Sequence, residues 1–303
     1  MTDFGKLRTE REARQRPAAS GGNVTRYSAA VGRYLSAAGY SPEDSVSAPP
    51  PPAAVRKGLV LVGVDETPTS YIAVDHAAIE AELRGWNLRL VHAQRPGGVR
   101  PHTREAGSQL LDRLVDRVHA YSPTVAVTGR LVVGSPAALL LLSARDADLV
   151  VVGHRHGTPG AVFGVSVGDR IAADHTGAVL VVRIPGWPAG PEFGTRPVVV
   201  GVDGDDSTAV GFAHREARLR GSGLVLLHAS RTPRIDRVEQ SDGVEMRWRY
   251  VVEDPSEALI EASSRAAALV VGRRGPGGIP SGPLGSVSRS VVQRAHCPVF
   301  LVG

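Results

Sequence analysis

The sequence predicts an α/β fold that contains two tandem parallel sheets. Two observations carry this prediction: short apolar runs alternate with helical segments, and the whole pattern occurs twice in the 303-residue chain. Near-continuous apolar strands are typical of parallel sheets that helices cover on both faces, because such strands are buried on both sides. No apolar run reaches eighteen residues, so no membrane-spanning helix is expected.

The first copy of the pattern begins at Gly58, where ordered structure should start. Its predicted strands are apolar runs at residues 59–64, 88–93, 125–133, 149–152 and 178–183. The helices predicted between them lie at residues 70–84, 104–121, 136–144 and 167–174. Gly85 is a stop signal for the first helix, and Ser135 before Pro136 is a start signal for the third. The first domain is therefore predicted at residues 58–185.

The pattern starts again after a linker at residues 186–196, which is rich in proline and glycine. Three motifs return: Val62-Gly-Val-Asp65 as Val200-Gly-Val-Asp203, Glu80-Ala-Glu-Leu-Arg-Gly85 as Glu216-Ala-Arg-Leu-Arg-Gly221, and His92-Ala93 as His228-Ala229. An internal repeat of one α/β unit explains these matches. The second domain is therefore predicted at residues 197–303.

The second repeat is shorter than the first. The offset between matching motifs falls from 136 to 119 residues between the second and fourth strands, so about 17 residues are missing there. This is about the size of the helix at 104–121, which predicts a loop or one helical turn in its place. The shortened repeat then exposes one sheet face, or uses the first repeat to cover it.

A glycine-rich loop of the second repeat joins a predicted strand at 266–271 to a predicted helix at 287–295. It contains Gly272, Gly275 and the pair Gly285-Ser286, with the spacing Gly-x2-Gly-x9-Gly-Ser. Backbone N–H groups and the helix dipole collect an anion at such a loop, and glycines let the chain approach it closely. Ser286 can cap the helix or give its hydroxyl to a phosphate. The loop predicts a phosphate site; the alternative is a surface loop before a capped helix.

This loop, with its flanking strands and the internal repeat, resembles the adenine-nucleotide loop of the universal stress protein family. The resemblance covers nearly all of residues 58–303. It implies a Rossmann-like, doubly wound sheet of five strands in each repeat, in the order 3-2-1-4-5. It also implies ATP, or AMP or ADP, as the ligand of the second domain. Family members usually pair as dimers, which implies that the two repeats pair through their fifth strands and leaves a further homodimer open.

The resemblance assigns roles to ten residues of the second repeat. Asp203 would lie at the adenine or ribose end, with Val202 and Ala229 lining the base. The other implied nucleotide-binding residues are Gly272, Arg273 and Gly275 around the ribose and first phosphate, and Gly285, Ser286, Val287 and Ser288 at the outer phosphates. Arg273, Arg274 and Arg289 supply positive charge, or else form a solvated rim. The alternative for Asp203 is a carboxylate that caps the turn after its strand.

The corresponding loop of the first repeat departs from the family pattern. His156 stands where the second glycine belongs, and Gly164 and Val165 stand where the Gly-Ser pair belongs. A side chain at position 156 would project into the path of a phosphate, so we expect this repeat to bind nucleotide poorly or not at all and to serve as a structural half. His154 and His156 do not predict a metal site, because no Cys or carboxylate stands nearby at ligand spacing.

Residues 1–57 are rich in Ala, Ser, Pro and Arg and are predicted to be a disordered tail or linker. Apolar side chains at positions 24, 27, 31, 34 and 35 share one face of a helix, which could dock on the body or on a protein partner, or form only transiently. This segment contributes +4 of the formal charge of +5, so the near-neutral remainder does not predict nucleic-acid binding. The single cysteine, Cys297, precedes the last strand and is expected to be a buried filler in a reducing cytoplasm.

The leading interpretation is a cytoplasmic tandem universal stress protein that acts as a nucleotide-responsive stress regulator. Efficient catalysis is not expected, because the only lysines are Lys6 and Lys57, no Walker-type loop exists, and no nucleophile–base pair is legible. Slow ATP hydrolysis or autophosphorylation, as in some relatives, stays open. Asp205 and Asp206 are the nearest carboxylates for a Mg²⁺ ion that accompanies the nucleotide.

Two other functions compete with this interpretation. The first is an interaction scaffold of the same fold that binds no nucleotide, favoured by the degraded first loop and the shortened second repeat. The intact loop of the second repeat argues against it. The second is an adenylating enzyme of the wider nucleotide α-hydrolase group, whose members usually carry Ser-Gly-Gly-x-Asp-Ser after the first strand. Here that position reads Asp203-Gly-Asp-Asp-Ser-Thr208, which disfavours it.

Overall fold

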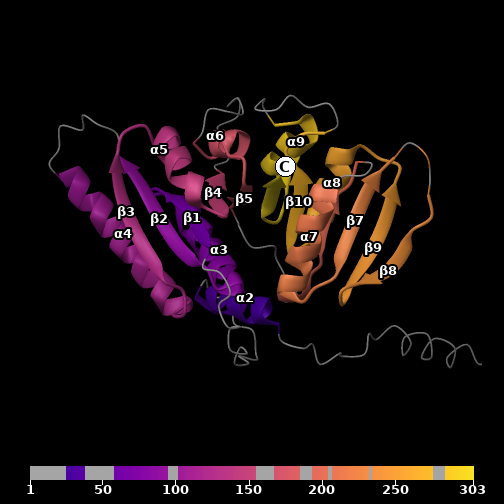
Figure 1. The fold of residues 1–303 in the computed structure, drawn as a ribbon, viewed down its shortest axis with the longest axis horizontal. Helices are drawn as coiled ribbons and strands as arrows, with labels where there is room; N and C mark the ends of the chain where they lie inside the picture. Colours follow the sequence, from indigo (N-terminus) through magenta and orange to yellow (C-terminus); the bar gives the residue numbers. More distant parts are fainter. Residues whose placement is uncertain are drawn as a thin grey trace, which may run out of the picture.

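The computed structural model describes residues 25–37, 58–94, 102–154, 167–184, 193–203, 207–230, 232, 234–275 and 284–303. Within these residues one continuous sheet of eleven strands runs through the molecule, in the order β3-β2-β1-β4-β5-β11-β10-β6-β7-β9-β8 (Figure 1). One buried apolar cluster lies on each face of this sheet. The strands are therefore the middle layer of a three-layer α/β molecule, as the apolar runs predicted.

The first repeat has the predicted strand order 3-2-1-4-5, with every pair parallel. Its strands are β1 (Leu59–Val64), β2 (Asn87–Gln94), β3 (Val127–Val133), β4 (Leu149–His154) and β5 (Ala178–Arg183). Its helices are α3 (Pro68–Arg84), α4 (His102–Tyr121), α5 (Pro136–Ser143) and α6 (Val167–Asp174), with a short 3₁₀ turn η1 (Ala144–Asp146) after α5. Helix α3 begins two residues earlier than expected, because proline fits the first turn of a helix.

The second repeat keeps the same order but has six strands instead of the expected five. Its elements are β6 (Val198–Gly201), α7 (Ser207–Arg220), β7 (Leu224–Ala229), β8 (Arg237–Ser241), β9 (Val244–Val251), α8 (Pro255–Ser263), β10 (Ala268–Gly272), α9 (Ser286–Arg294) and β11 (Val299–Val302). The expectation of a loop or a helical turn after β7 is wrong. The chain forms the antiparallel hairpin β8–β9 there, and Asp242 and Gly243 make its turn with φ of 47° and 80°. An Asp-Gly turn is a strong hairpin signal.

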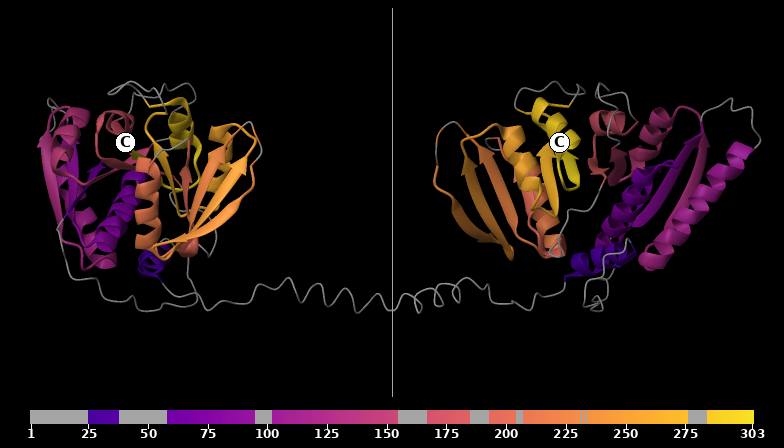
Figure 2. Two further views of the ribbon diagram at one scale, coloured as in Figure 1. Left: turned by 45° about the vertical axis from the view of Figure 1, so that its right-hand side comes forward. Right: turned by 180° about the vertical axis from the view of Figure 1, so that it is seen from behind.

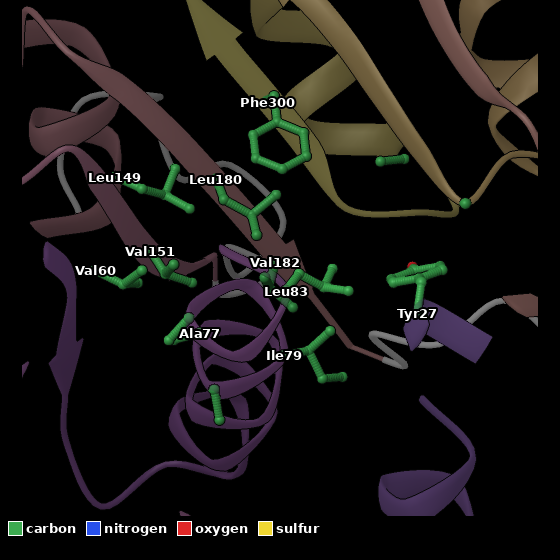
Figure 3. Close-up of a cluster of buried hydrophobic side chains, with 14 of the residues drawn as sticks. Tyr27, Val60, Ala77, Ile79, Leu83, Leu149, Val151, Leu180, Val182 and Phe300 are labelled. Carbon is green, nitrogen blue, oxygen red and sulfur yellow. The ribbon is translucent and has the colours of Figure 1, made fainter. Parts of the chain in front are cut away.

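The two repeats join edge to edge. Strand β5 pairs with β11 in antiparallel fashion, with Val299 opposite Val181 and Phe300 opposite Leu180. These are the fifth strands of the two repeats, so the two sheets expected from the sequence are one sheet in the structure. Phe300, Leu180 and Val182 are buried at this junction together with side chains of α3 (Figure 3).

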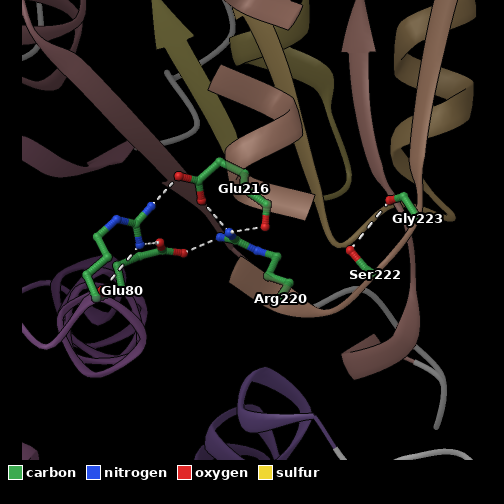
Figure 4. Close-up of polar contacts among 6 residues, drawn as sticks. Glu80, Glu216, Arg220, Ser222 and Gly223 are labelled. Atoms are coloured by element: carbon green, nitrogen blue, oxygen red, sulfur yellow. Dashed lines mark hydrogen bonds and ion pairs between the residues drawn. The ribbon is translucent and has the colours of Figure 1, made fainter. Parts of the chain in front are cut away.

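Four charged residues lie buried beside the junction, and they come from the repeated Glu-Ala-x-Leu-Arg motif. Glu80 and Arg84 belong to α3, and Glu216 and Arg220 belong to α7 (Figure 4). Each arginine is ion-paired with the glutamate of its own helix and with the glutamate of the other helix. The four side chains are between 1% and 8% exposed. We call these residues the charged quartet.

Part of the N-terminal segment, which the sequence predicts to be a disordered tail, is a helix. Residues Arg26–Ala37 form helix α2, which contacts α3 and α4 of the first repeat and α7 of the second, as well as the 3₁₀ turn η2 (Phe193–Thr195) (Figure 2). Four of its side chains are at most 3% exposed: Tyr27, Ala30, Val31 and Tyr34. The Arg220 guanidinium carbon lies 4.9 Å from the centre of the Tyr27 ring, so α2 covers the charged quartet. Helix α2 therefore docks on the two repeats, which is one of the expected alternatives. Position 24, the first of the predicted apolar positions, lies outside the described residues.

Among the described residues, none of the helices combines the length and the apolar character that crossing a membrane requires.

Candidate functional site

A cavity of about 870 Å³ lies in the second repeat, at the carboxyl ends of β6 and β10. These two strands are neighbours, and the helix connections leave them on opposite sides, so their ends form the crevice in which ligands of doubly wound sheets lie. Ten of the residues that line the cavity are those predicted from the sequence: Val202, Asp203, Ala229, Gly272, Arg273, Gly275, Gly285, Ser286, Val287 and Ser288. The fold brings them together from three separate stretches of the chain.

One end of the cavity is apolar. Val202 follows β6 and is 7% exposed, and its N–H donates to Leu227 of β7 at 3.0 Å. Helix α8 adds Pro255 and Leu259, which the sequence reasoning did not assign to the site. Leu259 lies so close to Gly201 that a Cβ there would be 3.0 Å from its Cδ1. This close packing explains why a glycine stands at position 201, and the glycine was a sequence signal that a side chain of α8 approaches β6.

Asp203 stands between the apolar end and the glycine-rich loop. Its side chain is exposed and lines the cavity. A Cβ at Gly275 would lie 3.9 Å from Oδ2 of Asp203, so the carboxylate faces the first turn of the loop across a short gap. Among the described residues that line the cavity, Asp203 has the one acidic side chain.

The opposite end is formed by the amino terminus of α9. Gly285 is the N-cap, and its carbonyl accepts the first intrahelical bond from the N–H of Arg289 at 2.9 Å. Ser286, Val287 and Ser288 occupy the first turn, where main-chain N–H groups have no partner within a helix. Because these residues line the cavity, their N–H groups and the positive end of the helix dipole suit an anion there. Arg274 also lines this cavity, and Thr208 of α7 lies on its wall.

The two serines at the start of α9 use their hydroxyls differently. Ser286 is the first residue of α9 and does not cap the helix, because Gly285 holds the N-cap position. Its side chain is exposed at the cavity, so the hydroxyl is available to a ligand. The Ser288 hydroxyl donates to the carbonyl of Gly272 at 2.6 Å, and the residue is 5% exposed. In this structure the hydroxyl joins α9 to the end of β10, whereas the family resemblance implies that it holds a phosphate.

Arg273 differs most from expectation. The residue borders the cavity but is only 2% exposed, and its side chain enters the junction between the repeats. There the guanidinium donates to the main-chain oxygens of Ala172 and Gly177 from the first repeat and to that of Gly303. Burial and the neighbouring Arg274 lower the pKa of Arg273 to about 10, so the side chain is still charged at neutral pH. The Arg273 guanidinium therefore does not contribute its charge directly to a phosphate in the cavity.

The matching position of the first repeat is arranged differently. Oδ1 of Asp65 accepts hydrogen bonds from the N–H of Thr67 at 2.9 Å and from the hydroxyl of Ser70 at 2.8 Å. The carboxylate is thus used by its own turn, which is the alternative considered for Asp203. A Cβ at Gly153 would lie 2.7 Å from the methyl group of Thr69, so a side chain fills the space above the end of β4. His156, Gly164 and Val165 lie outside the described residues.

The described residues contain no group of three or more His, Cys, Asp or Glu side chains that could hold a metal ion. Asp205 and Asp206, the carboxylates considered for Mg²⁺, lie outside them. Cys297 is buried, and burial raises the pKa of its thiol to about 12. It is therefore a structural residue, as expected, and not an activated nucleophile.

The chain is similar to known proteins of one family. The model of the universal stress protein family matches residues 59–183 and 235–303. The chain is 30% identical to universal stress protein Rv2623 of Mycobacterium tuberculosis over 284 residues, covering 80% of this chain and 95% of that protein. It is 30% identical to universal stress protein Rv1996 of the same species over 300 residues, covering 80% and 94%. A universal stress protein from Archaeoglobus fulgidus has a similar fold, with a TM-score of 0.63, 17% identity, and coverage of 80% and 97%.

Proposed function

This chain belongs to the universal stress protein family, and on that premise we propose that it binds ATP or a related adenine nucleotide in the cavity of its second repeat. One observation carries the proposal. The residues that the family resemblance assigns to the nucleotide surround one cavity of about 870 Å³ with an apolar end and a helix amino terminus at the other. A volume of this size is within the usual range for small-molecule sites.

The two ends of the cavity suit the two ends of a nucleotide. The adenine ring would lie against Val202, Ala229 and Leu259, where apolar contact replaces water. The exposed carboxylate of Asp203 would accept a hydrogen bond from a ribose hydroxyl. The phosphates would lie at the first turn of α9, where N–H groups and the Ser286 hydroxyl donate to them. Arg274 would add positive charge on the same side.

We further propose that the protein is a binding switch and not an efficient enzyme. The described cavity residues include no lysine, histidine or cysteine to act as a base or nucleophile beside Ser286. Asp203 is their one acidic side chain, so a Mg²⁺ ion would have to arrive with the nucleotide's phosphates and take most of its ligands from them and from water. In this proposal nucleotide occupancy changes how the protein contacts its partners during stress in the cytoplasm.

The first repeat would be a structural half that binds no nucleotide. Asp65 is held in its own turn, and Thr69 fills the space over Gly153. The alternative function, a scaffold that binds no nucleotide at all, needs no open cavity in the second repeat. The exposed Asp203 and the helix terminus therefore favour the nucleotide-binding proposal over the scaffold.

The test is calorimetric titration of ATP and of AMP into the full chain, beside the variant Ser286→Asp. An aspartate at the first position of α9 is favourable for the helix, so the fold should be kept. It places a negative charge within a few ångströms of the phosphates, which should weaken binding by roughly tenfold or more. Ser135→Asp is the matched control, because Ser135 is the N-cap of α5 in the first repeat.

The proposal expects binding by the wild-type chain and by Ser135→Asp, and clearly weaker binding by Ser286→Asp. Equal affinities for all three chains would place the nucleotide elsewhere. No heat from either nucleotide at high protein concentration, with none released on denaturing the purified protein, would leave the scaffold function.

A further inference from the structure

The side chain of Arg273 connects the loop of the second repeat to the first repeat. Its Nε donates to the carbonyl of Ala172 at 3.1 Å, and its Nη2 donates to the carbonyl of Gly177. Its Nη1 donates to the main-chain oxygen of Gly303 at 2.7 Å. The arginine is 2% exposed, and bonds from a charged donor are strong in such a water-poor place.

Ala172 lies in the last turn of helix α6, and Gly177 lies in the short segment between α6 and β5. The last carbonyls of a helix have no partner within the helix and carry its partial negative charge, so a cation there is favourable. Arg274 makes a second, longer contact to the same helix end, from Nη2 to the carbonyl of Ala173 at 3.4 Å. Two consecutive residues of the loop thus hold α6.

The main chain of Arg273 holds the phosphate end of the cavity. Its N–H donates to Val302 of β11 at 2.9 Å, and its carbonyl accepts from the N–H of Gly285 at 2.9 Å. Gly285 is the N-cap of α9, the helix whose first turn borders the cavity. One residue therefore connects α6 of the first repeat to the amino terminus of α9 in the second.

The opposite connection is not equivalent. At the offset of 119 residues, the counterpart of Arg273 is His154, and an imidazole cannot offer the five donors of a guanidinium. The first repeat instead sends Arg183, at the end of β5, to the carbonyl of Ala295 after α9, at 3.0 Å. Each repeat thus places an arginine at the end of the other's last helix, but only Arg273 belongs to a nucleotide loop.

We propose that Arg273 is a positioning residue that makes the phosphate end of the cavity in the second repeat depend on helix α6 of the first. The inference rests on the proposed function, because it concerns regulation of the same site. If docking on α6 holds the loop in its binding shape, then nucleotide binding must stabilise that docking by the same factor, since coupling between two sites is reciprocal. The first repeat, which binds no nucleotide, would then sense the occupancy of the second.

The experiment is amide hydrogen exchange of the full chain, with and without saturating ATP, combined with calorimetric affinities. In the wild type, ATP should slow exchange at residues 167–178 of the first repeat as well as at the start of α9. In Arg273→Gln, ATP affinity should fall about tenfold, and residues 167–178 should no longer respond at saturation. Arg273→Lys keeps the charge and can still donate to the carbonyls, so it should restore part of both effects and supplies a second folded variant.

Arg183→Gln is the control for the junction. It removes the hydrogen bond from Arg183 to the carbonyl of Ala295, which joins the two repeats without involving the glycine-rich loop. It should keep wild-type ATP affinity within about twofold. Equal losses in Arg183→Gln and Arg273→Gln would overturn the proposal, since they would report a general loosening of the junction. A wild-type protein that binds ATP without any response at residues 167–178 would also overturn it.

The positioning role of Arg273 can also be tested if the proposed nucleotide binding is wrong. If no chain binds ATP, Arg273→Gln should still speed exchange about tenfold at residues 167–178 and at 284–290 in the nucleotide-free protein. Unchanged exchange at both segments would overturn the positioning role of Arg273 independently of any nucleotide.

Discussion

The charged quartet makes the strongest prediction about stability. In Glu216→Gln the carboxylate between Arg84 and Arg220 becomes neutral while the volume of the side chain hardly changes. Two buried arginines then share the single carboxylate of Glu80. Removing one partner of a buried ion pair leaves an uncompensated charge and typically costs about 3–5 kcal/mol. We expect a loss of that size in the free energy of unfolding.

The assay is urea unfolding of the full chain, followed by circular dichroism at pH 7. Glu257→Gln is the matched control, because Glu257 pairs with Arg294 on the surface, where both side chains are more than half exposed. Exposed ion pairs contribute little to the free energy of unfolding, so Glu257→Gln should unfold at the same urea concentration as the wild type. A Glu216→Gln protein as stable as the control would refute the reasoning that the quartet holds the two repeats together.

The same variant tests the pH dependence of stability. Burial opposes the ionisation of Glu216, but Arg84 and Arg220 outweigh it and hold its pKa below the ordinary 4.5. A carboxyl whose pKa is lowered by folding contributes stability that is present above its unfolded pKa and lost as the pH falls through its folded pKa. Glu216→Gln should therefore flatten the loss of stability below pH 4.5. A wild-type slope in this range would contradict the assignment.

Three further predictions concern separate parts of the molecule. Tyr27→Ala removes a buried ring of α2 that lies over Arg220, and it should lower the free energy of unfolding in urea by about 3 kcal/mol. A change below about 1 kcal/mol would mean that the docking of α2 does not contribute to the stability of the chain. Asp203→Asn should weaken ATP binding about tenfold in calorimetry while Asp65→Asn leaves it unchanged, and the reverse would move the site to the first repeat. Cys297, whose pKa burial raises to about 12, should not react with a thiol reagent at pH 8 until the protein unfolds, and rapid labelling of the folded chain would contradict its burial.

Much of the fold could be predicted because its signals are local and repeated. The apolar runs and the three returning motifs locate the strands, and Asp242-Gly243 could also have revealed the hairpin that the sequence reasoning missed. Helix α2 is a different case. Its apolar face was visible, but docking depends on contacts with α3 and α7, which lie far away in the chain. A helical pattern shows which face is apolar and not what covers it.

In the candidate site, too, some features could be predicted from the sequence and others could not. Glycine spacing and strand ends identify where the main chain borders the cavity, so the ten predicted residues line it. Spacing does not tell where a side chain points. The Arg273 side chain turns away because three main-chain oxygens, two of them about a hundred residues earlier in the sequence, accept its hydrogen bonds in the junction. The Ser288 hydroxyl turns to Gly272 for a similar reason, since a buried hydroxyl needs an acceptor.

The number of nucleotides bound per chain distinguishes binding in the second repeat alone from binding in both repeats or in neither. Titration of ATP into the full-length protein measures it from the molar ratio at saturation. We predict one nucleotide per chain, bound in the second repeat beside Asp203 and the amino terminus of α9. A ratio of two would show that the first repeat binds despite its occupied Asp65, and a ratio of zero would contradict nucleotide binding altogether.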